Sequence, residues 1–183
     1  MQMESRWVIC CLIILVTLSV YWQVLGHGFT GFDDPEYISQ NVHVQDGLSL
    51  PSIIWAFTSL EAGNWHPITW LSHMLDVEMF GMDAGYHHFT NVVLHIFNSI
   101  IVFLLFLRIT GRFWPSCLVA FLFSLHPLHV ESVAWASERK DVLSTFFWLV
   151  TMWCYVKYVT HKHFGWYLGV ILAFIAGLMS KPM

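Results

Sequence analysis

The chain has 183 residues, of which 57% are hydrophobic and only 11% are charged, and its mean hydropathy is +0.61. This composition excludes an ordinary soluble domain and is typical of a protein that crosses a membrane several times. The formal net charge is −4 and the few basic residues are scattered, so the charge pattern does not indicate a nucleic acid as partner.

Apolar segments that could form transmembrane helices occupy residues 7–26, 89–107, 113–130, 142–158 and 164–180. A helix needs roughly 17 to 25 residues to cross the hydrocarbon core, so the shorter segments require tilt or snorkelling flanks. The first segment is followed by no cleavage motif, and we expect it to be an uncleaved signal anchor. The sequence therefore predicts an all-α, polytopic membrane helix bundle of about five spans.

The basic residues also predict an orientation for these spans. Most of them precede the first span or lie in the turns after the second and fourth, which share one side if the spans alternate. The positive-inside rule places that side, with the N-terminus, in the cytoplasm. The external side then carries a long first loop, residues 27–88, and a short loop near residues 131–141.

The long external loop is rich in Trp, Ile, Leu and Met, which does not fit a disordered linker. Residues 50–57 begin with a proline near a helix start, and residues 65–80 place apolar side chains at helical spacing. We predict two amphipathic helices on the external membrane surface, with Trp55, Trp65 and Trp70 at the headgroup level. The polar face of the second helix would carry His66, Thr69, His73 and Asp76. Packing of these helices as a small external cap remains the alternative.

Two adjacent acids, Asp33 and Asp34, open this loop directly after the first span. A partly desolvated carboxylate at a membrane surface suits a general base, because burial raises its pKa. The alternative is a structural role in a turn or cap, since Pro35 restricts Asp34 to extended conformations.

A polar stripe runs along the second predicted span. Asn91, His95 and Asn98 follow one another at i, i+4 and i+7 and so share one helix face. Such a face is costly in lipid and must look into the protein. It either makes hydrogen bonds between helices or lines a substrate cavity.

The short external loop contains His126, His129 and Glu131, which are residue types that bind metals. Pro127 distorts the helix there and the spacing matches no zinc signature, so we predict no metal site. Arg139 and Lys140 lie on the external side against the positive-inside bias. Arginine can bind two phosphate oxygens at once, so one expected role of these cations is to bind a phosphate. The other is to form ion pairs with the acids of the same loop.

Several motifs together resemble the N-terminal membrane half of the transmembrane and tetratricopeptide repeat proteins, which are protein O-mannosyltransferase-like glycosyltransferases of GT-C fold. Besides the acidic pair they are Asn-Trp-His-Pro-Ile-Thr-Trp at 64–70, His-His-Phe-Thr-Asn at 87–91, His-Pro-Leu-His-Val-Glu-Ser-Val-Ala-Trp at 126–135, Glu-Arg-Lys-Asp at 138–141 and Lys-Pro-Met at 181–183. That family continues with more helices and then repeats, and no 34-residue repeat occurs here. Either the chain is a fragment or it is a degenerate product, and we expect five helices alone to form an incomplete donor pocket.

The resemblance implies transfer of a sugar from a polyprenyl-phosphate donor to an acceptor hydroxyl, on a protein, at the external or lumenal face. The bilayer, the lipid-linked donor and the protein acceptor would be its partners, in an endoplasmic reticulum or bacterial inner membrane. It implies an acid of the first loop as catalytic base, Asp33 or Asp34, and we favour Asp33 as the first of the pair. Our own inference assigns the donor phosphate or substrate to Arg139, Lys140, His126, His129, Glu138, Asn91 and His95.

Two other functions remain open at this point. One is a non-catalytic membrane scaffold or assembly protein that keeps the fold. The other is a transporter, or a helical membrane protein that binds metal or haem, which the eleven histidines would suit.

Overall fold

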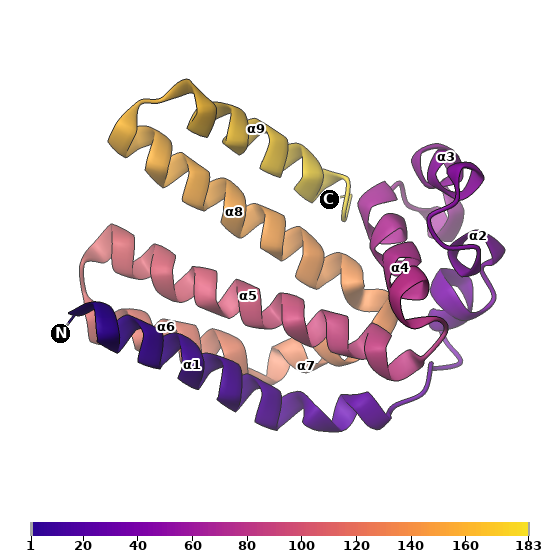
Figure 1. Ribbon diagram of the computed structural model, residues 1–183, viewed down its shortest axis with the longest axis horizontal. Coiled ribbons are helices and arrows are strands. Elements are labelled where there is room, and N and C mark those ends of the chain that lie inside the picture. Colours follow the sequence, from indigo (N-terminus) through magenta and orange to yellow (C-terminus); the bar gives the residue numbers. More distant parts are fainter. Residues whose placement is uncertain (1, 183) are drawn as a thin grey trace.

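The computed structural model describes residues 2–182, and helices are the only regular structure in that part of the chain. Larger helices build a bundle in which α5 contacts α1, α6 and α8, while α9 packs on α8 (Figure 1). These helices are α1 (Gln2–Tyr21), α5 (Ala84–Thr110), α6 (Phe113–Leu125), α8 (Arg139–His161) and α9 (Phe164–Leu178). The prediction of an all-α helix bundle is confirmed.

The long segment between α1 and α5 folds into a helical cap. Figure 1 shows its helices gathered at one end of the bundle, beside the C-terminal end of α9. They are α2 (Val42–Gln45), α3 (Leu50–Thr58) and α4 (Pro67–Phe80), preceded by a π-helical turn at Pro35–Ser39. A further short helix, α7 (Val130–Ala134), lies between α6 and α8 in the sequence.

Three helical segments of the described chain are long and apolar enough to cross a membrane: Ser5–Gly26, Ala84–Thr110 and Ala136–His161. A fourth span results if Phe113–Leu125 and Pro127–Ala134, which are bent by 46° at their junction, count as one. The helix of the fifth predicted span, Phe164–Leu178, has 15 residues and is shorter than an ordinary span. The chain is thus a polytopic integral membrane protein.

The break between α6 and α7 follows from the local sequence. His126 takes an extended conformation, with ψ of 129°, because the ring of Pro127 disfavours the helical conformation in the residue before it. The third predicted span, residues 113–130, is therefore interrupted.

Both ends of α5 carry ordinary capping residues. Asp83 accepts a hydrogen bond from the Gly85 amide at the start of α5. Gly111 ends that helix at φ 67°.

The cap has its own core, and this core corrects the expected placement of its helices. Trp70 is fully buried there and does not lie at a membrane surface. The polar residues of α4 (His66, Thr69, His73 and Asp76) are buried as well, whereas Leu75 and Met79 are 45% and 56% exposed. The polar face of α4 looks into the protein because its partners lie on α5, on α8 and beyond α9.

Candidate functional site

The two acids of the loop occupy different environments. Asp34 is fully buried, and its Oδ2 accepts hydrogen bonds from the Thr30 amide at 2.7 Å and the Thr30 hydroxyl at 3.0 Å. Its Oδ1 accepts from the Ser137 amide at 3.0 Å, just before α8. Asp33 is partly exposed, and its carboxylate makes no hydrogen bond within residues 2–182. Asp34 therefore ties the loop to the bundle, and Asp33 is left available.

The charge of Asp33 acts on Tyr37, which is also influenced by Lys140 and Glu138. We call these four residues the Asp33 site. Lys140 Nζ lies 4.7 Å above the centre of the Tyr37 ring and 3.0 Å from Glu138 Oε1. Burial raises the pKa of the Tyr37 hydroxyl; the charge of Lys140 opposes that rise, and the charge of Asp33 adds to it. The group thus combines one unengaged carboxylate with a half-buried cation.

His66 closes the Asp33 site on the side of the cap. Its ring stacks on Tyr37 with the centroids 5.4 Å apart and lies 4.6 Å from the nearest ring centroid of Trp70. Burial, followed by the nearby charge of Lys140, lowers the pKa of His66 from 6.5 to about 4. His66 is therefore neutral at physiological pH.

Arg139 forms an ion pair, which is the second of the two roles that the sequence leaves open for it. Its side chain is fully buried, and Nη2 lies 2.6 Å from Asp76 Oδ2 and 2.8 Å from the His87 carbonyl oxygen. Its Nε donates to Asn91 Oδ1. Asp76, Asn91 and the start of α5 thus occupy the guanidinium, which leaves it no free edge for a lipid phosphate. Lys140, its neighbour in the sequence, is the cation that reaches the Asp33 site.

The polar stripe on α5 holds helices together. Asn91 Nδ2 donates to the Trp135 carbonyl at 2.7 Å, and Asn98 Nδ2 donates to the Val142 carbonyl at 2.9 Å. His95 Nε2 lies 3.1 Å from the Ser124 carbonyl oxygen on α6. Hydrogen bonding between helices, one of the two readings left open by the sequence, accounts for all three residues. His95 and Asn98 additionally line a hollow of about 370 Å³ with His129, Asp141 and Lys181.

The two histidines that follow α6 have different surroundings. His126 is exposed, and its Nδ1 accepts a hydrogen bond from the Leu128 amide at 3.2 Å. His129 packs on Phe123 and His95, with ring centroids 4.7 and 5.6 Å away. Glu131 lines a different hollow beside Trp135. The structure does not bring these residues to the Asp33 site.

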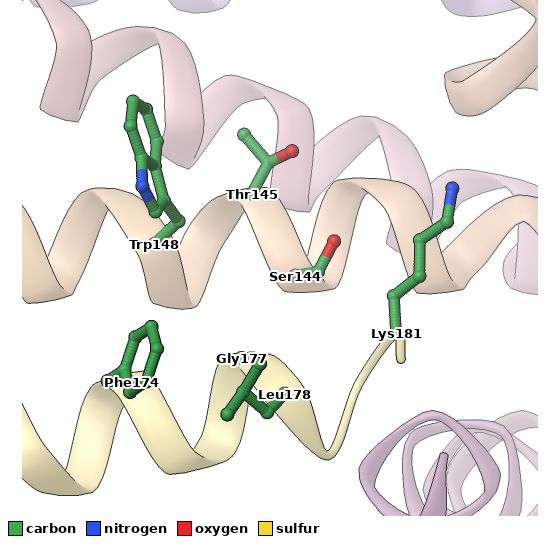
Figure 2. A pocket seen from close by; sticks show the side chains of 7 residues that line it. All are labelled: Ser144, Thr145, Trp148, Phe174, Gly177, Leu178 and Lys181. Carbon is green, nitrogen blue, oxygen red and sulfur yellow. The ribbon is translucent and has the colours of Figure 1, made fainter. Parts of the chain in front are cut away.

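A third hollow, of about 230 Å³, lies in the groove between α8 and α9, and Figure 2 shows its lining. Trp148, Phe174 and Leu178 make its walls apolar, and Ser144 and Thr145 add hydroxyl groups. Lys181 lies at one end of the hollow and pairs with Asp141. The preceding residue, Ser180, accepts a hydrogen bond from Thr69 of the cap. The sequence reasoning noted Lys181 only as part of a motif, although a lone cation directly after an apolar segment was a usable signal.

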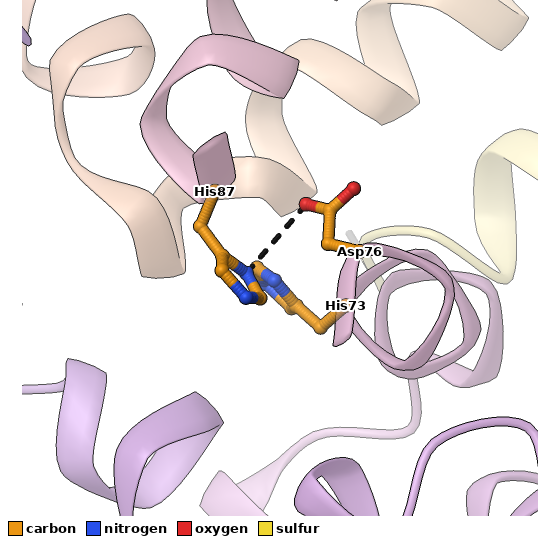
Figure 3. A group of neighbouring side chains, drawn as sticks. All are labelled: His73, Asp76 and His87. Atoms are coloured by element: carbon orange, nitrogen blue, oxygen red, sulfur yellow. Dashed lines mark ion pairs between the residues drawn. The ribbon is translucent and has the colours of Figure 1, made fainter. Parts of the chain in front are cut away.

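One group of side chains in the described part of the chain has donor atoms close enough to hold a metal ion. It consists of His73, Asp76 and His87, whose ligand atoms lie within 4.8 Å of one another (Figure 3). All three residues are buried. The i, i+3 spacing of His73 and Asp76 was visible in the sequence, but the approach of His87 was not.

Comparison with known proteins shows to which family the chain belongs. Residues 51–183 match the family model described as dolichyl-phosphate-mannose-protein mannosyltransferase. The chain is 28% identical over 194 residues to protein O-mannosyl-transferase Tmtc2 of Drosophila melanogaster, with 98% of the chain and 20% of the relative covered. It is 29% identical over 156 residues to protein O-mannosyl-transferase TMTC3 of Mus musculus, with 80% and 16% covered.

The relatives are much longer than this chain. Protein O-mannosyl-transferase Tmtc1 of Drosophila melanogaster is 27% identical over 169 residues, which cover 88% of the chain and 20% of the relative. The chain spans about a fifth of the length of the curated relatives it matches. No solved structure matches the chain.

Proposed function

Since the chain belongs to the dolichyl-phosphate-mannose-protein mannosyltransferase family, a family of integral membrane proteins of GT-C fold, we propose that it carries the catalytic base of a membrane glycosyltransferase. The donor is a polyprenyl-phosphate sugar, of which dolichyl-phosphate mannose is the first candidate. The acceptor is a hydroxyl group on a protein. Transfer takes place at the external or lumenal face, where the cap lies.

The observation that carries this proposal is the contrast between Asp33 and Asp34. A general base needs a carboxylate that can approach an acceptor hydroxyl, and Asp33 is partly exposed without a hydrogen-bond partner among the described side chains. Both oxygens of Asp34 are already engaged by the Thr30 amide and hydroxyl and by the Ser137 amide. Asp33 is therefore the base, and Asp34 fixes the loop that presents it.

In the proposed reaction Asp33 takes the proton from the acceptor hydroxyl, and the acceptor oxygen attacks the anomeric carbon of the donor sugar. The bond from that carbon to the phosphate oxygen breaks, and the polyprenyl phosphate leaves with the electron pair. A phosphate leaving group needs a cation more than it needs an acid. This fits a site with one free carboxylate and a lysine.

Two lysines are the candidates for holding the donor phosphate. Lys140 shares the Tyr37 ring environment with Asp33. Lys181 stands at one end of the apolar groove between α8 and α9. We propose that the lipid chain lies along this groove, with its phosphate at the Lys181 end. We do not include Arg139 in the donor site, because its guanidinium is paired with Asp76.

Sugar transfer by the full-length protein that contains this chain tests the proposal. With dolichyl-phosphate mannose as donor, Asp33→Asn is expected to lower kcat by about 10² to 10⁴, the usual contribution of a general base. Asp46→Asn is the matched control, since Asp46 is an exposed acid of the same loop. Full turnover by a folded Asp33→Asn protein would exclude Asp33 as the base. Absence of transfer by the unmodified protein would favour the scaffold function.

A further inference from the structure

His87 stands between two hydrogen-bond acceptors. Its Nε2 lies 3.4 Å from the Gly81 carbonyl oxygen, and its Nδ1 lies 3.5 Å from Asp76 Oδ2. A neutral imidazole has a single N–H and can donate to only one of them. The other nitrogen then turns its lone pair toward an oxygen. Either the ring carries a second proton, or a cation lies between Nδ1 and the carboxylate.

His73 distinguishes these two possibilities. It is fully buried on α4, its ring centroid is 5.8 Å from that of His87, and neither of its ring nitrogens has a hydrogen-bond partner in the described structure. A second proton on His87 would leave both nitrogens of His73 without a partner. Each buried polar atom left unpaired lowers the stability of the folded protein. A metal ion would accept one lone pair from each ring and from Asp76.

The surroundings of these donors resemble the supporting contacts of metal ligands. A metal-bound histidine usually donates its other N–H to a carbonyl or a carboxylate, and His87 Nε2 faces the Gly81 carbonyl in this way. A metal-bound carboxylate is usually held by hydrogen bonds of its own. Asp76 Oδ1 accepts from the Thr90 hydroxyl at 3.0 Å, and Oδ2 from Arg139 at 2.6 Å.

We infer that His73, Asp76 and His87 bind a divalent transition-metal ion, of which Zn²⁺ suits two imidazoles and one carboxylate best. The site joins α4 of the cap to α5 of the bundle (Figure 3). This goes beyond the proposed sugar transfer and differs from the expectation of no metal drawn from the sequence. Arg139 repels a further cation, so the affinity will be lower than that of a site without a neighbouring positive charge.

Metal analysis of the purified protein tests this inference without any activity assay. After incubation with Zn²⁺ and removal of free metal, mass spectrometry is expected to find about one zinc per chain. His73→Gln and His87→Gln are expected to lose it. The exposed His126 provides the matched control, and His126→Gln should retain the metal. Co²⁺ in place of Zn²⁺ should give the visible absorption of a four-coordinate site in the unmodified protein and in His126→Gln, and not in His73→Gln or His87→Gln.

Two results would overturn the inference. One is the absence of bound zinc and cobalt from the unmodified, folded protein, which would assign the gap between His73 and His87 to water or to a second proton. The other is undiminished metal in a folded His73→Gln protein. If the glutamine variants fail to fold, chelation decides: a chelator is expected to lower the Tm of the unmodified protein, and an unchanged Tm contradicts the site.

Discussion

Arg139 and Asp76 form an ion pair in which Nη2 lies 2.6 Å from Oδ2, with side-chain exposures of 0% and 2%. The two residues are 63 positions apart in the chain and join α8 of the bundle to α4 of the cap. Arg139 also donates to the His87 carbonyl at 2.8 Å and so includes the start of α5. This pair therefore fixes the cap on one end of the bundle.

Replacement of Arg139 by methionine is expected to lower the free energy of unfolding by about 3–5 kcal/mol, because it leaves the Asp76 carboxylate buried without its cation. Arg139→Lys should restore only part of this loss, since an ammonium group cannot reproduce the fork of donors. Unfolding in mixed detergent would measure the change. Lys181→Gln is the control: its pair with Asp141 is partly exposed and worth about 0–1 kcal/mol. A loss from Arg139→Met as small as the control would contradict the role assigned to this pair.

Substitutions of the two adjacent acids, Asp33 and Asp34, should affect stability and activity separately. Asp34→Asn is expected to cost about 1–3 kcal/mol of unfolding free energy, because the new amide places a donor against the amides of Thr30 or Ser137. Asp33→Asn, at a side chain without such partners, should change stability by less than about 0.5 kcal/mol. Thermal unfolding of both variants measures this. Equal destabilisation would mean that Asp33 is also a structural residue.

Gly85 in the first turn of α5 has no room for a side chain. A Cβ there would overlap the carbonyl oxygen of Leu25, which belongs to the turn after α1. Gly85→Ala is therefore expected to destabilise the protein by roughly 1–3 kcal/mol, although alanine favours a helix. Gly26→Ala provides the control, because a Cβ at Gly26 meets no atom within 4 Å. If both variants melt at the same temperature, the close approach of α5 to Leu25 is not tight.

Local patterns were enough to predict the two longer helices of the cap, although not α2. The proline near residue 50 and the spacing of residues 65–80 predicted α3 (Leu50–Thr58) and α4 (Pro67–Phe80). The same patterns gave the wrong environment for Trp70, because periodicity shows which residues share a face and not what that face meets. The partner of Thr69 is the Ser180 carbonyl, 111 positions away. The sequence pattern of one helix cannot predict a contact between residues so far apart in the chain.

The candidate site shows a similar limit. Arg139 and Lys140 are adjacent and equally basic, and the sequence assigned both to a phosphate. In the structure they start α8 and point to different neighbours, Asp76 and Tyr37. Successive residues of a helix are rotated by about 100°, so the register of its first turn decides which cation is buried. The assignment of Asp33 as the base stays a prediction.

Acid should weaken the cap through His66. The pKa of His66 is lowered to about 4 by burial, with Lys140 as the second cause. Between pH 6.5 and about 4 the unfolded chain binds a proton at His66 that the folded protein does not bind, so stability falls as the pH falls. His73 lies on the same helix, and burial lowers its pKa well below the usual range as well. Part of the acid sensitivity will therefore persist without His66.

His66→Gln tests this pH dependence. Its unfolding free energy is expected to decline less steeply below pH 6.5 than that of the unmodified protein, and to approach a constant difference above it. Tyr37→Phe serves as the control, since it keeps the ring that stacks on His66 and removes no group that titrates in this range. Parallel pH curves for His66→Gln and the unmodified protein would assign the acid sensitivity to other groups.

The proposed position of the donor lipid in the groove between α8 and α9 predicts how substitutions there change the KM for the donor. If the lipid phosphate sits at Lys181, Lys181→Gln should raise the KM for the donor about tenfold, which corresponds to one lost charge-assisted hydrogen bond, and should change kcat little. Lys162→Gln, at the other end of α8, is the control. Trp148→Ala shortens the apolar wall and should raise the KM for a long-chain donor more than for a short-chain analogue. An equal effect on both donors would place the lipid chain outside this groove, whatever the role of Asp33.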